Sequence, residues 1–378
     1  MAWSNGACDT TTLVVRWPGS KVSCVPDLLA ATAELVNIGS VSHDEGPFTD
    51  YLEGRLRNVA WLQVERLENN LVARTMLGRS QRLLLVGHTD TVPANGNATA
   101  RIDGDLLWGL GSADMKSGLS VFLHLAETVP TPSVDVTYVF YECEEVAAKF
   151  NGLTKLFGTR PDLLAGDAAV LGEPTNAAIE AGCQGTLRAE LCVSGRRAHT
   201  ARAWMGRNAI HRLGLVLDRI SSYEGRRPTI DGCTYREAIQ AVRIEGGVAG
   251  NVVPDRATLT LNHRFAPDRT LDQALDALRA VIGDDVLADD ATLTLVDAAP
   301  GAPPSLRHPL IRGLAQRVGT APTAKLGWTD VAFFAAHGTP AVNFGPGDPT
   351  IAHTAAEHVT RRDIEAAHAA LRGLITEE

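Results

Sequence analysis

Histidine and carboxylate side chains directly follow stretches of this chain that are predicted to form strands. The clearest example is the apolar run Leu83–Val86, after which Gly87 ends the run and His88 and Asp90 follow. Neutral imidazole is a good ligand for Zn²⁺, and Asp90 could accept the other ring proton of His88 and so orient the ring. The plain alternative is a loop histidine beside an aspartate that caps the next turn.

Four further clusters of this kind occur later in the chain. They are Asp114 in the run 109–116, Glu144 and Glu145 after a strand that ends near Tyr141, Glu173 between Gly172 and Pro174, and His353. Taken singly, each residue could cap a helix or lie in a solvated loop. Because α/β sheets gather their sites at the carboxyl ends of strands, the clusters together predict a two-metal ligand set.

Charge counting divides these residues between two zinc ions. With Asp114 as the bridge, one ion takes His88, Asp114 and Glu173, and the other takes Asp114, Glu145 and His353. A bridging water completes four ligands on each ion, and three carboxylates with one hydroxide balance the charge of two Zn²⁺. The cofactor prediction is therefore two Zn²⁺ per chain, with Co²⁺ able to substitute.

Glu144 is surplus to this ligand count. A free carboxylate beside an activated water is the expected general base, which passes a proton to the leaving nitrogen. The sequence therefore predicts Glu144 as the catalytic base and Asp90 as a residue that supports the site.

Alternating strands and helices indicate how these residues are positioned. Strands are predicted near residues 61–64, 70–75, 82–87, 134–141 and 168–171, with helices from Val25 to Val36, over 48–59 and over 115–129, and a short hairpin near Asp103. This order favours an α/β fold, a mostly parallel sheet with helices on both faces.

The pattern changes after Cys183. Strands near 186–193, 239–244, 257–265 and 291–296, with helices near 206–220 and 271–281, form a βαββαβ order that is typical of a ferredoxin-like α+β domain. The βα pattern resumes after a Pro-rich connector and ends in an amphipathic helix that is expected from Arg361 to Thr376. We therefore expect a catalytic domain in two parts, 1–184 and 298–378, around an inserted lid or dimerisation domain, 185–297. Residues 1–24 are expected to be a loose N-terminal extension.

Composition excludes several classes of function. The net charge of −9 argues against a nucleic-acid partner, because phosphate binding requires a basic face. No apolar run approaches the roughly 20 residues of a membrane span, and we find no secretory signal in the first residues. The six cysteines form no CxxC pair, which favours reduced thiols and a cytoplasmic location.

These motifs, in this order, resemble the aminoacylase/carboxypeptidase family of di-zinc metallohydrolases. The resemblance covers nearly the whole chain from about residue 25 and is carried by the following runs: Gly87–Pro93, residues 109–118, Glu144-Glu145, Gly172–Pro174 and His353. It implies the same metal roles and a cis peptide bond after Asp114. The expected substrate is a small N-acyl amino acid.

Within the family the chain is similar to the desuccinylase branch in its actinobacterial form. The residues that carry this likeness lie in runs 114–118, 143–145, 180–186, 250–254, 263–269 and 327–330. The likeness implies hydrolysis of N-succinyl-LL-2,6-diaminopimelate to succinate and LL-2,6-diaminopimelate, for lysine and cell-wall synthesis. An acetylornithine deacetylase, or another N-acyl-amino-acid deacylase of the family, is the alternative.

The resemblance also implies substrate contacts. Arg264 and Asn251 match positions that hold substrate carboxylates, and a guanidinium fork suits that task. Thr186, Gly327 and Thr329 match residues that line the pocket. The chain departs from proteobacterial desuccinylases, which have Arg-Arg-Gly-Ser where this chain has residues 183–186, Cys-Gln-Gly-Thr, and Thr-Ser-Asp where it has residues 328–330, Trp-Thr-Asp.

His199 lies in the predicted inserted domain and is too distant along the chain to be expected as a metal ligand. Considered without the family, it is a solvated loop histidine. The resemblance implies that a homodimer, formed through the inserted domains, delivers His199 into the partner's site. There an imidazole could donate a hydrogen bond to the oxyanion that forms during amide hydrolysis.

Overall fold

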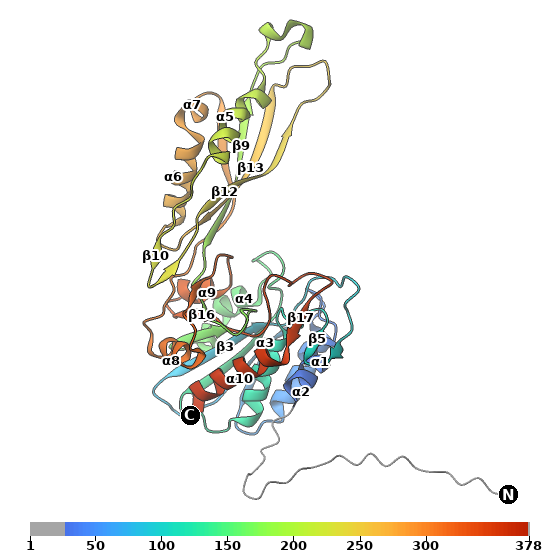
Figure 1. Cartoon of the computed structure of the whole chain (residues 1–378), viewed down its shortest axis with the longest axis vertical. Coiled ribbons are helices and arrows are strands. Elements are labelled where there is room, and N and C mark those ends of the chain that lie inside the picture. Colours follow the sequence, from blue (N-terminus) through green and yellow to red (C-terminus); the bar gives the residue numbers. More distant parts are fainter. Residues whose placement is uncertain (1–26, 377–378) are drawn as a thin grey trace, which may run out of the picture.

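The larger part of the molecule is built around one eight-stranded sheet (Figure 1). The computed structural model describes residues 27–376, so the predicted extension over residues 1–24 lies outside the described residues. Four central strands are parallel neighbours, whereas both edges of the sheet contain antiparallel pairs. The order is β1 (Gln63–Leu67), β2 (Asn70–Arg74), β6 (Asp135–Tyr141), β3 (Arg82–His88), β7 (Ala168–Leu171), β16 (Ala341–Asn343), β8 (Glu180–Ala181) and β15 (Thr323–Ala324).

Helices cover both faces of this sheet, as predicted for the α/β class. One face packs against α1 (Leu28–Val36), α2 (Gly46–Arg57), α3 (Lys116–Thr128), α8 (Pro309–Val318) and α10 (Arg361–Thr376). The other face packs against α4 (Gly152–Thr159), the 3₁₀ helix η1 (Pro161–Leu164) and α9 (Val331–Ala336). Strand β3 therefore has no exposed face, which explains its continuous apolar run.

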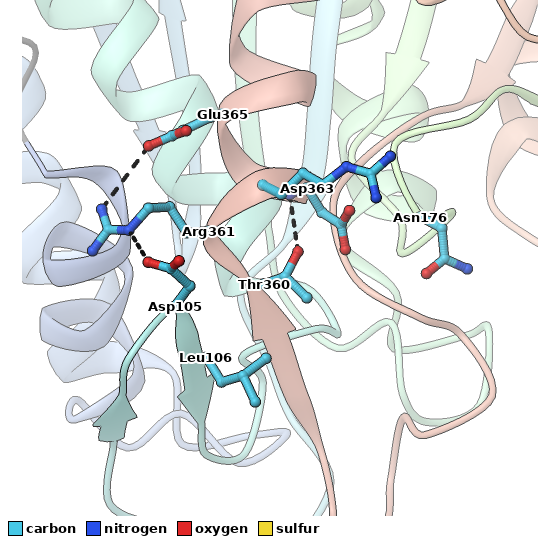
Figure 2. A pocket seen from close by; sticks show the side chains of 8 residues that line it. Asp105, Leu106, Asn176, Thr360, Arg361, Asp363 and Glu365 are labelled. Atoms are coloured by element: carbon cyan, nitrogen blue, oxygen red, sulfur yellow. Dashed lines mark hydrogen bonds and ion pairs between the residues drawn. The ribbon is translucent and has the colours of Figure 1, made fainter.

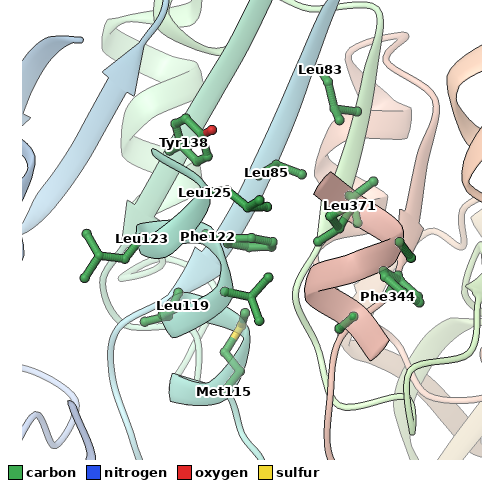
Figure 3. Close-up of a cluster of buried hydrophobic side chains, with 14 of the residues drawn as sticks. Leu83, Leu85, Met115, Leu119, Phe122, Leu123, Leu125, Tyr138, Phe344 and Leu371 are labelled. Carbon is green, nitrogen blue, oxygen red and sulfur yellow. The ribbon is translucent and has the colours of Figure 1, made fainter. Parts of the chain in front are cut away.

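The core on the first face is made of side chains from sheet and helices together (Figure 3). Phe122 and Leu125 of α3 and Leu371 of α10 lie beside Leu85 of β3. All four side chains are at most 1% exposed. This packing holds α3 against the sheet, so the loop before α3, which carries Asp114, has a fixed position.

A small three-stranded sheet flanks the first face. It contains the predicted hairpin of β4 (Arg101–Asp103) and β5 (Leu106–Trp108), which turns at Gly104, and β17 (His358–Thr360) pairs with β5. Gly104 has a φ of +59°, a conformation that glycine adopts without steric cost. Pairing with β17 fixes the end of the loop that carries His353.

The second sheet is four-stranded and fully antiparallel. Its order is β12 (Ala238–Gly246), β13 (Arg256–Phe265), β9 (Gly185–Ser194) and β14 (Ala291–Ala299). Alternate residues of β13 are buried against the helices α5 (Ala209–Ser221) and α6 (Leu271–Ile282). This is the predicted ferredoxin-like βαββαβ order. The remaining elements are the 3₁₀ helix η2 (Thr200–Met205), α7 (Asp284–Leu287) and the hairpin of β10 (Thr229–Ile230) and β11 (Cys233–Thr234).

The antiparallel sheet points away from the larger part of the molecule (Figure 1). Gly185 and Phe265 pair at the end of the sheet near the larger part, and Ser194 and Arg256 pair at the far end. The ten residues of β13 span about 30 Å at the usual rise of a strand. Among residues 27–376 we find no helix with the length and apolar character needed to cross a bilayer.

Candidate metal centre

His88 ends β3 at the carboxyl edge of the larger sheet and is buried between two carboxylates. Its Nε2 lies 3.1 Å from Oδ1 of Asp114, and its Nδ1 lies 3.0 Å from the carbonyl oxygen of Asp90 and 3.4 Å from Asp90 Oδ1. Burial lowers the pKa of His88, but the hydrogen bonds to Asp114 and Asp90 outweigh it and raise this pKa well above its usual range. Two anions around a buried imidazole make a site that attracts a cation.

Asp114 lies between the two histidines. Its Oδ1 faces His88, and its Oδ2 is 3.6 Å from Nε2 of His353. The peptide bond after Asp114 is cis. Glu357 accepts hydrogen bonds from the backbone N–H groups of Ala113 and Asp114, at 3.0 and 3.1 Å, and so holds this loop in place. One carboxylate that faces both histidines has the arrangement expected of a bridge.

Glu144 and Glu145 are positioned through Asp90. The two Asp90 oxygens accept hydrogen bonds from the backbone N–H groups of Glu144 at 2.9 Å and Glu145 at 3.1 Å, and Ser42 Oγ donates to the same carboxylate at 2.7 Å. Glu145 Oε1 then lies 2.7 Å from His353 Nε2. This contact raises the pKa of His353 to about 9, although partial burial opposes the rise.

The predicted ligands form two overlapping groups. Possible ligand atoms of His88, Asp114 and Glu173 lie within 4.8 Å of one another, and so do those of Asp114, Glu145 and His353. Glu173 Oε1 is buried and has no hydrogen-bond partner among the described residues. Burial, together with the nearby Asp114 carboxylate, raises the pKa of Glu173 to about 8. An orphaned, buried carboxylate oxygen beside a histidine fits a metal ion.

Glu144 belongs to neither group but lies beside both. Ligand atoms of His88, Glu144 and Glu145 also fall within 4.8 Å of one another. Burial raises the pKa of Glu144 well above its usual range, and the nearby Asp330 carboxylate raises it further. A carboxylate that holds a proton readily is suited to transfer one.

Three residues that position this site were not assigned a role from the sequence. Glu357 holds the Asp114 loop, and Glu45 Oε1 accepts a hydrogen bond from Cys143 N at 3.2 Å, directly before Glu144. Asp330 accepts from Tyr141 OH and Asn151 Nδ2, both at 2.7 Å. These carboxylates act on backbone or side-chain donors far away in the sequence, so no local pattern marks them.

The predicted substrate residues fall into two places. Arg264 pairs with Thr186 in the register of β13 and β9, at the near end of the antiparallel sheet. Burial lowers the pKa of the Arg264 guanidinium, and no carboxylate among residues 27–376 offsets that effect. Gly327 and Thr329 precede α9, and the buried Thr329 Oγ1 has no described hydrogen-bond partner.

Asn251 and His199 lie side by side at the far end of the same sheet. The carbonyl of Asn251 accepts a hydrogen bond from Thr200 N at 3.0 Å, and His199 forms an isolated antiparallel β-bridge with Val252. His199 is exposed, and its Nδ1 accepts from Ala201 N at 3.0 Å. The structure therefore separates Asn251 from Arg264 by about the length of β13, roughly 30 Å.

A cavity of about 690 Å³ lies elsewhere, between β5 and the start of α10 (Figure 2). Arg361 in its wall contacts Asp105 at 2.9 Å and Glu365 at 3.9 Å. The cavity is lined by none of the predicted site residues.

Comparison with known sequences gives a consistent result over nearly the whole chain. Residues 84–377 match the sequence model of peptidase family M20/M25/M40. A Mycobacterium tuberculosis protein assigned by name as the succinyl-diaminopimelate desuccinylase DapE is 51% identical, covering 92% of this chain and 97% of that protein. The succinyl-diaminopimelate desuccinylase of Corynebacterium glutamicum is 42% identical, covering 93% and 96%.

Solved structures share the fold at lower identity. A tripeptidase from Staphylococcus aureus has a TM-score of 0.74 and 21% identity, covering 93% of this chain and 97% of that one. A Bacillus subtilis protein described as a dinuclear metal-binding peptidase of the M20 family has a TM-score of 0.67 and 14% identity, covering 92% and 96%. The larger sheet and the inserted antiparallel sheet thus recur together in other proteins.

Proposed function

The chain belongs to peptidase family M20/M25/M40, and on that premise we propose that it hydrolyses N-succinyl-LL-2,6-diaminopimelate to succinate and LL-2,6-diaminopimelate. Two relatives named for this reaction, at 51% and 42% identity, support the substrate. The observation that supports metal-dependent amide hydrolysis is the position of Asp114, which faces His88 on one side and His353 on the other. Glu144 lies beside both ligand groups.

Two Zn²⁺ ions are the proposed cofactor. His88, Asp114 and Glu173 would hold one ion, and Asp114, Glu145 and His353 would hold the other. Two features support this assignment: the buried Glu173 oxygen that lacks a hydrogen-bond partner among the described residues, and the combination of nitrogen and oxygen donors, which suits Zn²⁺. When bound, such a pair makes a water more acidic and polarises a carbonyl group. A related fold, at 14% identity, is described as a dinuclear metal-binding peptidase.

Glu144 is the proposed general base and acid. It takes the proton of the attacking water and delivers it to the amide nitrogen, which leaves as the amine. Asp90 supports this role because it holds the backbone N–H groups of both Glu144 and Glu145. The peptide loop is thereby fixed while the Glu144 carboxylate remains able to move a proton.

Substrate carboxylates are proposed to bind residues at the boundary of the two sheets. Arg264 offers a partly buried guanidinium on which no carboxylate of the described residues acts, next to Thr186 in the strand register. Gly327 and Thr329 lie on the loop before α9, where the unpaired Thr329 hydroxyl can donate or accept. We assign residues 1–184 and 298–378 to the catalytic domain and 185–297 to a lid that closes over the substrate.

A homodimer through the inserted domains is also proposed. His199 and Asn251 lie at the end of the antiparallel sheet that points away from the larger part of their own chain, so a partner's site is the place where they can act (Figure 1). Exposed apolar side chains near this end and along the edge strand β12 are suited to a subunit interface. They are Trp204 at 79% exposure, Met205, Val242, Ile244 and Val248.

A cytoplasmic location is proposed from the cysteines and the substrate. Cys143, Cys183, Cys192 and Cys233 are all free thiols. Free thiols persist in a reducing compartment. A small-molecule substrate, without nucleic acid or membrane, is the proposed partner.

The purified enzyme is expected to contain two metal ions per chain, and His353→Ala should lower the content by about one, because one of the two ligand sets loses its only histidine. Metal analysis by mass spectrometry measures this. His211→Ala, an exposed histidine on α5, is the matched control and should retain both ions. Unchanged metal content in His353→Ala would contradict the assignment.

Turnover of a substrate panel tests the function itself. We expect kcat/KM for N-succinyl-LL-2,6-diaminopimelate to be about 100-fold higher than for N-acetylornithine and other N-acyl amino acids. This ratio corresponds to a difference of about 2.7 kcal/mol in transition-state binding between the substrates. Release of succinate and of the free amine is measured for each compound. A higher kcat/KM for N-acetylornithine would instead identify a deacetylase.

A further inference from the structure

A half-buried ion pair between Lys325 and Glu180 lies at the edge of the larger sheet. Lys325 follows β15, Glu180 begins β8, and these two strands are parallel neighbours. Lys325 Nζ donates a hydrogen bond to Glu180 Oε2 at 2.5 Å. The two side chains are 13% and 23% exposed, so the pair is largely enclosed but still reached by solvent.

The strand register places this pair close to the metal centre. Asn343 of β16 pairs with Leu171, two residues before Glu173, and on its other side with Glu180. Because neighbouring strands are about 4.8 Å apart, Glu180 lies about 10 Å from the strand that leads to Glu173. Both carboxylates therefore lie at the same edge of the sheet.

Lys325 also lies beside the start of the antiparallel sheet. Gln184 N donates a hydrogen bond to the carbonyl of Lys325 at 3.2 Å, directly before β9 begins. Lys325 in turn precedes by two residues the loop that begins at Gly327. The ion pair therefore lies at the boundary of the two sheets, where Thr186 pairs with Arg264.

An ion pair is the complement of a zwitterion. The end of diaminopimelate that is not succinylated carries an ammonium and a carboxylate on one carbon. Five single bonds separate that carbon from the scissile nitrogen and span about 6 Å when extended. If the ammonium meets Glu180 and the carboxylate meets Lys325, every charge exchanges one partner for another and none is left buried alone.

We propose that Glu180 and Lys325 form the subsite for the zwitterionic end of the substrate and that they select diaminopimelate derivatives over other N-acyl amino acids. This inference rests on the proposed desuccinylase function and extends it to a specificity device in this chain. The pair is connected to the catalytic groups through β16 and the loop before α9. Glu180 is suited to bind the distal ammonium of the substrate, and Lys325 is suited to bind the distal carboxylate.

The test measures kcat/KM for three N-succinyl compounds. They are N-succinyl-LL-2,6-diaminopimelate, N-succinyl-L-lysine, which lacks the distal carboxylate, and N-succinyl-L-2-aminopimelate, which lacks the distal ammonium. Lys325→Met should lower kcat/KM about 10- to 100-fold for the two compounds with a distal carboxylate and should spare the lysine compound. Glu180→Gln should lower it for the two with a distal ammonium and should spare the aminopimelate compound.

Two controls separate specificity from stability. Arg307→Met removes an exposed ion pair with Asp231 and should leave all three substrates unaffected. The double variant Glu180→Gln, Lys325→Met removes both charges without leaving either one unpaired, and it should hydrolyse the three compounds with similar kcat/KM. Thermal unfolding of each variant is recorded alongside.

Equal losses on all three compounds in the single variants would overturn the subsite, because a merely structural ion pair affects every substrate alike. If the unaltered enzyme hydrolyses none of the succinyl compounds, the proposed function fails and the subsite fails with it. If the enzyme prefers the diaminopimelate compound but the variants show no dependence on the distal groups, only the subsite fails.

Discussion

Glu144→Gln is expected to lower kcat by about 10²- to 10⁴-fold or more while both metal ions remain bound. The amide keeps the size of the side chain but cannot take a proton from water. The metal ligands should be undisturbed, because Asp90 holds the backbone of this loop through the N–H groups of Glu144 and Glu145. The measurement combines steady-state kinetics with metal analysis of the same sample.

The matched control for this variant is Glu365→Gln, an exposed glutamate on α10, which should leave turnover unchanged. Loss of one metal ion from Glu144→Gln would show that Glu144 is a ligand. The roles of Glu144 and Glu145 would then be reversed. Full metal content with near-normal turnover would remove Glu144 from the mechanism.

Activity is expected to return when two inactive variants, His199→Ala and Glu144→Ala, are mixed under conditions that exchange subunits. In a mixed dimer the chain with intact Glu144 receives intact His199 from its partner, so one of the two sites is complete. With random exchange half of the dimers are mixed, and activity should approach about one quarter of the unaltered enzyme. The observation that motivates this test is the place of His199 at the far end of the antiparallel sheet.

Mixing His199→Ala with itself under the same exchange conditions is the control and should restore nothing. Formation of mixed dimers is verified with two affinity tags. If mixed dimers form and no activity returns, His199 acts within its own chain or has no catalytic role.

Strong local patterns predict the centre of the fold well. The run Leu83–Val86 indicates a strand covered on both faces, and periodic apolar positions predict α10 over its observed range, Arg361–Thr376. The carboxyl ends of the parallel strands β3, β6, β7 and β16 share one edge, which brings His88, Glu145, Glu173 and His353 together. Asp114 joins them from the loop before α3.

Short or non-local features could not be predicted in the same way. β8 and β15 have two residues each, too few for a periodic signal, so local sequence does not predict this edge of the sheet. Glu45 and Glu357 position the site by accepting hydrogen bonds from backbone N–H groups of loops that are distant in the sequence. No local sequence pattern predicts such contacts. Asn251 and Arg264 are far apart because the extended strand β13 lies between them, so a shared likeness to substrate-binding positions does not place them in one site of one chain.

The position of β16 in the larger sheet determines when the sheet can be completed during synthesis of the chain. In the sheet, β16 lies between β7 and β8. In the chain, both of these strands precede the inserted domain, whereas β16 follows it and is synthesised much later. His353 follows β16, and its contact with Glu145 joins positions 208 residues apart. A nascent chain that has emerged only as far as the inserted domain therefore lacks both a central strand and one of the proposed metal ligands. On the proposed assignment, the complete centre can take up its metal ions only after the last part of translation.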